Sequence, residues 1–305
     1  MLNRVLFSFP GQGAQRPGML ANLPGGGARL AEASEALEED LSALDSAESL
    51  AKTRSVQLSL LIKGVSYADL LRAEGIEPDM TAGLSIGAYA AAVASGALKF
   101  SDAVKLVSVR GRVMEEAYPA GFGMMAIMGL PLPTVEAICA ETKDLYVANY
   151  NAETQIVVSG SDLALRKASD AALKQGAEKC KRLRVAVPSH CPLMERVVPE
   201  LKEAMEKVTL LRPRKAYLSV TTGRVLWTPT AIAEDLVYNM ARRTQWREVA
   251  RAAFERGVGF AVEVPPGSVL TKLTRAAAPE IASESVAETS LTDIKARFAA
   301  FKLRG

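Results

Sequence analysis

The feature that most constrains the fold is the stretch of residues 81–89, TAGLSIGAY, which is typical of a strand end, a tight turn and a helix start. Within it, Gly83 and Gly87 flank Ser85 in the pattern Gly-x-Ser-x-Gly. A β-carbon at either glycine would collide with the neighbouring strand or helix. The pattern is typical of a nucleophile elbow, whose strained turn exposes a serine hydroxyl. The alternative is a serine that only caps the helix, and the stretch alone favours neither.

Composition predicts an ordinary globular protein without a nucleic-acid or membrane role. The 305 residues are 49% hydrophobic and 23% charged, with a net charge of +3 from scattered basic residues. No apolar run is as long as a membrane span, and the start is too short for the apolar region of a signal peptide. Three cysteines, Cys139, Cys180 and Cys191, have no metal-like spacing. We therefore expect a cytoplasmic protein without a metal or a bound cofactor.

The chain contains a single histidine, His190. A histidine metal site is therefore excluded, and any imidazole base must be His190. Taken alone, a histidine after a proline-serine turn is more often a surface or capping residue.

A glycine-rich loop, GQGAQ at residues 11–15, follows a short buried strand at residues 5–9. It lacks the third glycine of a dinucleotide fingerprint and the Gly-Lys-Ser/Thr of a phosphate loop. Loops at the carboxyl ends of strands hold binding groups in α/β folds. The loop is therefore a second candidate part of a site.

The order of predicted strands and helices in residues 122–188 differs from that in the rest of the chain. Strands at about 124–128, 146–148, 155–159 and 181–187, with helices at 133–140 and 162–175, follow the order β-α-β-β-α-β. That order predicts a ferredoxin-like subdomain, inserted into a discontinuous domain of residues 1–121 and 189–305. In this larger domain we expect one helix that ends at about residue 44, one that starts at 101 and one at the carboxyl terminus, and further helices at 56–74, 192–208, 232–240 and 246–256. We expect its strands just before residue 83, at 216–220, at 260–264 and near 286.

Six stretches in register now point to one family. They are FPGQGAQ at 9–15, GLSIG at 83–87, RGRVM at 110–114, VPSHC at 187–191, QW at 245–246 and EVPPG at 263–267. Together they closely resemble the malonyl-CoA:acyl-carrier-protein transacylase family over nearly the whole chain. The resemblance implies an α/β-hydrolase-like large domain with an inserted ferredoxin-like subdomain, and acyl transfer through a serine ester.

The resemblance also assigns roles to the reacting groups. Ser85 resembles the nucleophile, and His190 resembles its general base. The backbone N–H groups of Gln12 and Ile86 are similar to an oxyanion hole. Malonyl-CoA would then be the substrate, and the thiol of a carrier-protein prosthetic group the acceptor.

Two further residues would bind and orient. Arg110 matches the arginine that holds the malonyl carboxylate, which would be costly to bury unpaired. Arg112 competes for this role, but helical spacing turns it about 200° away from Arg110. Gln245 matches a residue near the histidine whose carbonyl or side chain helps orient the imidazole. Cys191, beside the base, is expected to be a buried bystander because no second histidine exists to activate it.

Departures from the family pattern suggest a branch. Leu84 stands where most members have histidine, and Ala88 where glutamate commonly follows. The region of residues 18–52 is shorter and richer in glycine. These features resemble the epsilon subunit of bacterial malonate decarboxylase, which would transfer malonyl to the prosthetic group of a small carrier subunit. The alternative within the family is the transacylase of fatty acid or polyketide synthesis.

Two other classes of function stay open. Gly-x-Ser-x-Gly also permits a serine esterase or thioesterase, although no Asp or Glu is marked as the acid partner of His190. A non-catalytic subunit that docks the carrier is the third possibility. Val187 and Ser189 lie where related acyltransferases tune the acyl pocket.

Overall fold

Two β-sheets organise the chain, and the computed structural model describes residues 2–118 and 120–303. The main sheet has the strand order β10-β9-β1-β2-β7-β8, and its first five strands run parallel. Only β8 pairs antiparallel, with β7. The strands are β1 (Arg4–Phe9), β2 (Met80–Gly83), β7 (Ala216–Leu218), β8 (Val225–Leu226), β9 (Val258–Glu263) and β10 (Ala282–Ser285).

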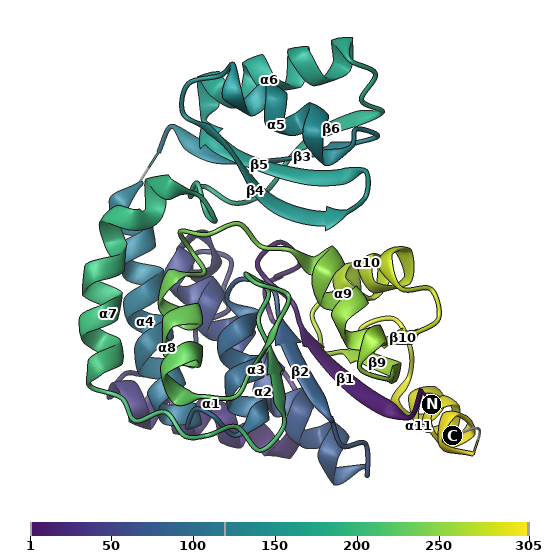
Figure 1. Cartoon of the computed structure of the whole chain (residues 1–305). Helices are drawn as coiled ribbons and strands as arrows, with labels where there is room; N and C mark the ends of the chain where they lie inside the picture. The colour runs from purple at the N-terminus through teal and green to yellow at the C-terminus, as the bar shows by residue number, and fades with distance from the viewer. Residues whose placement is uncertain (1, 119, 304–305) are drawn as a thin grey trace.

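Helices cover both faces of the main sheet (Figure 1). Alternate residues of β1 divide between the faces: Val5 and Phe7 pack with α2, α3 and α4, whereas Leu6 packs with α9 and α10. The helices of this part are α1 (Ala28–Leu37), α2 (Thr53–Ala73), α3 (Gly87–Ser95), α4 (Phe100–Ala117), α7 (Val198–Glu206), α8 (Pro229–Tyr238), α9 (Trp246–Glu255), α10 (Val269–Ala277) and α11 (Leu291–Lys302), with short 3₁₀ turns η1 (Pro24–Gly27), η2 (Ser49–Ala51) and η3 (Pro192–Val197).

The second sheet is wholly antiparallel and has the order β4-β5-β3-β6. Its elements are β3 (Phe122–Met128), α5 (Leu132–Ala140), β4 (Leu145–Ala152), β5 (Gln155–Ser161), α6 (Asp162–Lys174) and β6 (Lys179–Arg182). Both helices lie on its outer face, and its other face looks toward the main sheet (Figure 1). The expected mixed α/β class, with a parallel-rich sheet and a second sheet, is confirmed.

Several predicted elements have different bounds, such as the strand expected at 146–148, which extends over Leu145–Ala152. The strand expected at 181–187 lies earlier, at β6, because the residues after Arg182 leave the sheet edge and return to the main sheet. The helix expected at 192–208 begins as 3₁₀ and becomes α-helical only at Val198. Pro199 explains this, since it has no N–H to donate to the preceding turn and fits only the first turn of an α-helix.

Other differences arise where local patterns are weak. The helix expected to about residue 44 ends at Leu37, because Glu38 adopts a left-handed conformation with φ of 55°. Helix α10 and the two-residue strand β8 were not predicted. In the described residues no helix has both the length and the apolar character needed to cross a membrane.

Candidate active site

Ser85 occupies a strained turn between β2 and α3. Its φ is 55°, a left-handed conformation that residues other than glycine rarely adopt. A β-carbon at Gly83 would lie 2.0 Å from the carbonyl carbon of Gly87, and one at Gly87 would lie 2.1 Å from Phe9 O. Within the described residues the Ser85 hydroxyl caps no helix N–H, so the capping alternative is wrong. The backbone geometry is that of a nucleophile elbow.

The glycine-rich loop packs directly against this turn. Leu84 N donates to Phe9 O at 2.9 Å, and a β-carbon on Gly11 would lie 3.0 Å from Leu84 O and 3.5 Å from Ser85 Cβ. Gln12 follows Gly11, which packs against Ser85, and Ile86 follows Ser85 directly in the chain. Across residues 2–118 and 120–303, neither N–H donates to another protein group. Both are available to an oxyanion.

Arg110 brings a positive charge to the serine from inside the protein. Its side chain on α4 is fully buried; Nη2 donates to Ser85 Oγ at 3.2 Å, and Nη1 donates to Gln57 Oε1 at 2.7 Å. Its Nε has no partner, and no carboxylate forms an ion pair with it in the described part of the chain. Burial lowers the pKa of Arg110. A buried, unpaired cation is costly unless an anion joins it.

Arg112 points away from this cluster, as the helical spacing predicts. It is exposed and pairs with Glu116 at 3.0 Å and with Glu200. Arg110 is thus the arginine that faces Ser85.

His190 lies buried beside the same cluster. It has a left-handed φ of 64°, and its Nδ1 lies 2.6 Å from the carbonyl oxygen of Asn239. A carbonyl only accepts, so Nδ1 carries the proton and Nε2 keeps a free lone pair. Burial, followed by the charge of Arg110, lowers the pKa of His190 to about 4. The imidazole is therefore neutral at pH 7.

Asn239 joins the predicted residues and was missed by the sequence reasoning. Besides holding His190, its Oδ1 accepts from Arg110 Nη2 at 3.2 Å, and its Nδ2 donates to Ser85 O at 3.4 Å. Nothing in the sequence marks it beyond a polar residue at a helix end. Gln57 was missed for the same reason, being one polar residue within the buried part of α2.

The placement of Gln245 corrects a sequence-based assignment. The carbonyl against the imidazole belongs to Asn239, six residues earlier, whereas the Gln245 amide donates to Thr221 O at 2.7 Å. The segment after α8 turns away past His190 before it reaches Gln245, which begins α9. Gln245 therefore fixes the turn after β7 and does not orient the imidazole.

Helix α8 sets the position of Asn239. Asp235, on its inner face, accepts hydrogen bonds from the hydroxyls of Tyr217 at 2.7 Å, Ser219 at 2.6 Å and Thr221 at 2.8 Å. One turn later, Asn239 N donates to Asp235 O at 2.9 Å. The buried carboxylate thus ties the end of α8 to the main sheet.

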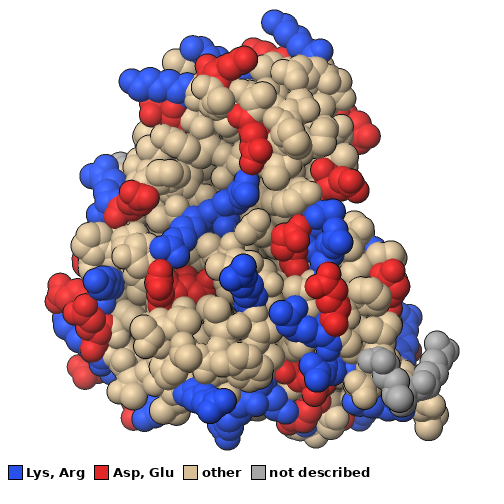
Figure 2. All heavy atoms as spheres, viewed as in Figure 1, with Lys and Arg blue, Asp and Glu red and all other residues tan. Residues whose placement is uncertain are grey.

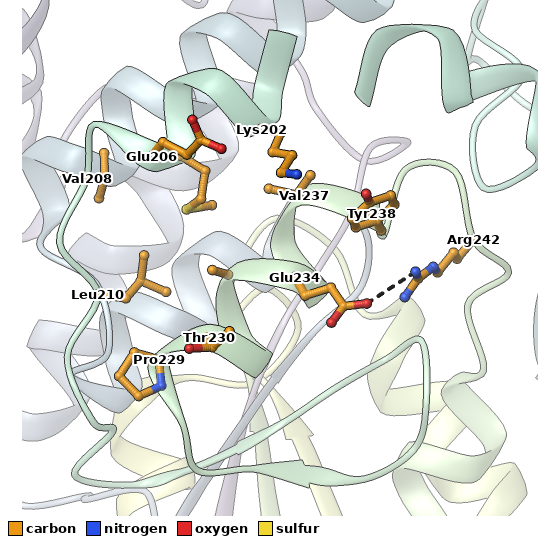
Figure 3. Close-up of a pocket in the computed structure, with 12 residues that line it drawn as sticks. Lys202, Glu206, Val208, Leu210, Pro229, Thr230, Glu234, Val237, Tyr238 and Arg242 are labelled. Atoms are coloured by element: carbon orange, nitrogen blue, oxygen red, sulfur yellow. Dashed lines mark hydrogen bonds and ion pairs between the residues drawn. The ribbon is translucent and has the colours of Figure 1, made fainter. Parts of the chain in front are cut away.

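The other face of α8 lines a hollow of about 580 Å³ against α7 (Figure 3). At its edge Glu234 pairs with Arg242 at 3.3 Å, and the Arg242 guanidinium lies 4.5 Å from the Tyr238 ring centre. These contacts brace the segment behind His190 from outside.

A second hollow, of about 510 Å³, lies beside Gln12 between α2 and the second sheet. Lys52, Arg182 and Arg184 give it a cationic rim, and Val56 and Phe122 are among its apolar walls. It borders the glycine-rich loop, whose Gly11 packs against Ser85.

The cysteines offer no competing nucleophile. Burial raises the pKa of Cys191 to about 12, and its Sγ donates to Pro188 O at 3.1 Å. Among the residues described, no group of three His, Cys, Asp or Glu side chains is arranged to hold a metal ion.

Comparisons with known proteins show which chains are similar to this one. The acyl transferase domain model matches residues 6–304. The malonyl CoA-acyl carrier protein transacylase of Salmonella typhimurium is 36% identical over 90% of this chain and 93% of its own length. The Bacillus subtilis protein of the same name is 34% identical over 90% of each chain.

Solved structures show the same fold. The malonyl-CoA:acyl carrier protein transacylase of Xanthomonas oryzae superposes with a TM-score of 0.90 at 34% identity, over 98% of both chains. A malonyl-transacylase in complex with a holo type II polyketide acyl-carrier protein gives 0.88 at 32% identity, over 99% of this chain and all of the other.

Proposed function

We propose that this chain, which belongs to the malonyl-CoA:acyl-carrier-protein transacylase family and is a malonyltransferase, carries the malonyl group as an ester on Ser85. One observation supports the proposal most: a fully buried arginine, which has no acidic partner among the described residues, donates to the serine hydroxyl at 3.2 Å. A carboxylate two carbons from the attacked carbonyl satisfies that charge with two parallel hydrogen bonds. Arg110 is thus proposed to select malonyl over neutral acyl groups.

His190 is the proposed proton carrier. Its neutral Nε2 takes the proton from Ser85 Oγ as the oxygen attacks the thioester carbon. When the carbon–sulfur bond breaks, the imidazolium gives this proton to the departing CoA thiolate. The carrier thiol then loses its proton to His190 and attacks the ester, and Ser85 regains a proton as it leaves. The proton and the leaving group balance in each half-reaction.

The backbone N–H groups of Gln12 and Ile86 are the proposed oxyanion hole. Gln12 follows Gly11, which packs against Ser85, Ile86 follows Ser85 directly, and neither N–H has a partner in the described chain. Removal of one such donor in other enzymes costs about 10²–10³ in rate.

The second sheet is proposed to close the site. We assign residues 1–121 and 189–305 to an α/β-hydrolase-like domain and residues 122–188 to a ferredoxin-like subdomain, which the order β4-β5-β3-β6 supports. The hollow with Lys52, Arg182 and Arg184 lies where the two meet. Its cations suit the phosphates of CoA, and its walls exclude water until the second thiol arrives.

An acyl carrier protein is the acceptor that the relatives support, since their names specify it. A second candidate is the small carrier subunit of malonate decarboxylase. Leu84 and Ala88, beside the nucleophile, favour it because they replace the polar residues usual in the transacylases of fatty acid synthesis.

Two carriers test the acceptor. The malonyl-enzyme is mixed with a carrier bearing phosphopantetheine or with one bearing the phosphoribosyl-dephospho-CoA group. Faster transfer to phosphopantetheine supports the transacylase, and faster transfer to the second group supports the decarboxylase subunit. Rapid release of free malonate without transfer to either would instead identify a thioesterase.

A further inference from the structure

Four cationic side chains line a hollow at the amino-terminal edge of the main sheet. Its volume is about 580 Å³, and its lining is Arg4, Asp79, Met80, Arg214, Lys215, Ala216, Val225, Trp227 and Arg256. Arg4 begins β1, whereas Ser85 follows the carboxyl end of the parallel strand β2. Six residues of strand span about 20 Å, so the hollow and the serine lie at opposite ends of the sheet.

In the described part of the chain, two carboxylates lie at or near these four cations, so the cluster keeps a net positive charge. Asp79 lines the hollow and accepts the N–H of Val5 at 2.8 Å, and nearby Glu77 pairs with Lys215 at 3.5 Å. The remaining three lining cations are Arg4, Arg214 and Arg256. In the part of the chain that the structure describes, none of these arginines forms an ion pair, and all three are exposed. The three arginines line one concave space. Arg256 Nη1 donates to the neutral carbonyl of Ala252 at 3.0 Å, so within the described residues no carboxylate pairs with any of the three charges.

The side chain of Trp227 also lines this hollow. Trp227 is 48% exposed, which is unusual for a tryptophan. Trp246, the second tryptophan of the chain, is fully buried and donates to Thr274 Oγ1 at 3.2 Å. An exposed indole beside arginines offers a flat surface on which a nucleobase stacks.

We propose that this hollow, the amino-edge site (Arg4, Arg214, Lys215, Trp227 and Arg256), binds a nucleoside polyphosphate. Guanidinium groups bind phosphate oxygens through paired hydrogen bonds, and the volume lies within the range of small-molecule sites. Such a ligand has two sources: the adenosine 3′,5′-bisphosphate part of CoA, or a free nucleotide such as ATP. The site uses no residue of the acyl-transfer machinery, so it stands independently of the proposed function.

Tryptophan fluorescence tests the site directly. The full-length protein is titrated with adenosine 3′,5′-bisphosphate and, separately, with ATP. We expect at least one nucleotide to quench Trp227 in a saturable manner, and the tighter ligand identifies the source. Quenching should be equal in the Ser85→Ala variant, because the two sites are separate. Trp227→Phe should remove the signal, since the buried Trp246 is shielded from the ligand.

Calorimetry on charge variants completes the test and does not depend on the indole signal. Arg214→Gln and Arg256→Gln should each weaken nucleotide binding by about tenfold, whereas Arg166→Gln on the exposed face of α6 should leave it unchanged. The proposal fails if neither nucleotide gives saturable binding. It also fails if the Arg214→Gln, Arg256→Gln double variant, shown by circular dichroism to be folded, binds as tightly as the wild type.

Discussion

Arg110 carries its charge in the protein interior, where its hydrogen bonds go to Gln57, Ser85 and Asn239 and to no acid in the part of the chain that the structure describes. Replacing it by alanine should lower kcat/KM for malonyl-CoA by about 10²–10³, the usual loss when one partner of a buried charge pair is removed. Acetyl-CoA, which lacks the carboxylate, should lose much less. Steady-state transfer with both thioesters measures the difference.

Arg112→Ala is the matched control, because it lies on the same helix but is exposed and paired with Glu116 and Glu200. It should leave both rates near those of the wild type. Equal losses for malonyl and acetyl in Arg110→Ala would show that Arg110 is structural.

The environment of His190 predicts an unusual pH profile. Because its pKa is lowered to about 4, the base is neutral throughout the pH range where a free imidazole titrates. In transfer assays, kcat/KM should stay level as pH falls through 6.5 and decline only as it approaches 4. A decline centred near 6.5 would contradict the buried, neutral imidazole.

The lowered pKa of His190 also affects the free energy of unfolding, which can be measured independently of activity. Between pH 6.5 and about 4, His190 is protonated in the unfolded chain but neutral in the folded chain. Because the unfolded chain binds this proton, acid favours unfolding. This contribution to stability is complete above pH 6.5 and is lost as pH falls toward 4. Urea unfolding of His190→Gln should show a shallower loss of stability over that window than the wild type.

Ser85, His190 and Arg110, which the sequence singles out, lie in one cluster, whereas Asn239 and Gln57, which hold them, were not predicted. The elbow serine, the single histidine and Arg110 stand in fixed local motifs. Asn239 acts through a backbone carbonyl, which every residue has, so no side-chain pattern could reveal it. This is also why the orienting role was placed on Gln245, six residues too late.

Helix α8 connects the main sheet to the site, because Asp235 binds residues of and after β7 and Asn239 follows at its end. Asp235→Ala removes the acceptor of three hydroxyl groups and frees the helix end that carries Asn239. We expect kcat to fall about tenfold at unchanged KM, with a loss of stability of about 1–3 kcal/mol. Steady-state kinetics and urea unfolding measure the two effects.

Asp235→Asn should restore most of kcat, because an amide can still exchange hydrogen bonds with the hydroxyls. Asp170→Asn on exposed α6 is the control for a change of charge alone. If Asp235→Ala keeps full kcat while losing stability, α8 supports only the fold.

Helices and strands such as α2 and β1 were predictable because their buried residues form a regular hydrophobic pattern in the sequence. Elements defined by tertiary contacts were not. Strand β6 is an edge strand whose extent depends on pairing with β3, and α10 depends on Glu263, which accepts the N–H groups of Leu270 and Thr271. Neither dependence has a local signal.

The two ends of the main sheet carry different candidate sites. The carboxyl ends of its parallel strands point toward the second sheet (Figure 1). Ser85 follows the carboxyl end of β2, and the residues of the amino-edge site lie at the other end of the sheet. Figure 2 shows Lys and Arg mixed with Asp and Glu over the viewed face, without one dominant sign. The proposed selection of malonyl therefore rests on local groups, Arg110 above all, and not on the net charge of +3.

The most direct test of the account is the mass of the intact protein after exposure to malonyl-CoA. We predict one added malonyl group per chain, mapped by peptide mass analysis to Ser85, absent from Ser85→Ala, and lost when a thiol-bearing carrier gains it. Uptake of malonyl by Ser85→Ala, or a malonyl group mapped to Cys191 or any residue other than Ser85, would contradict the account.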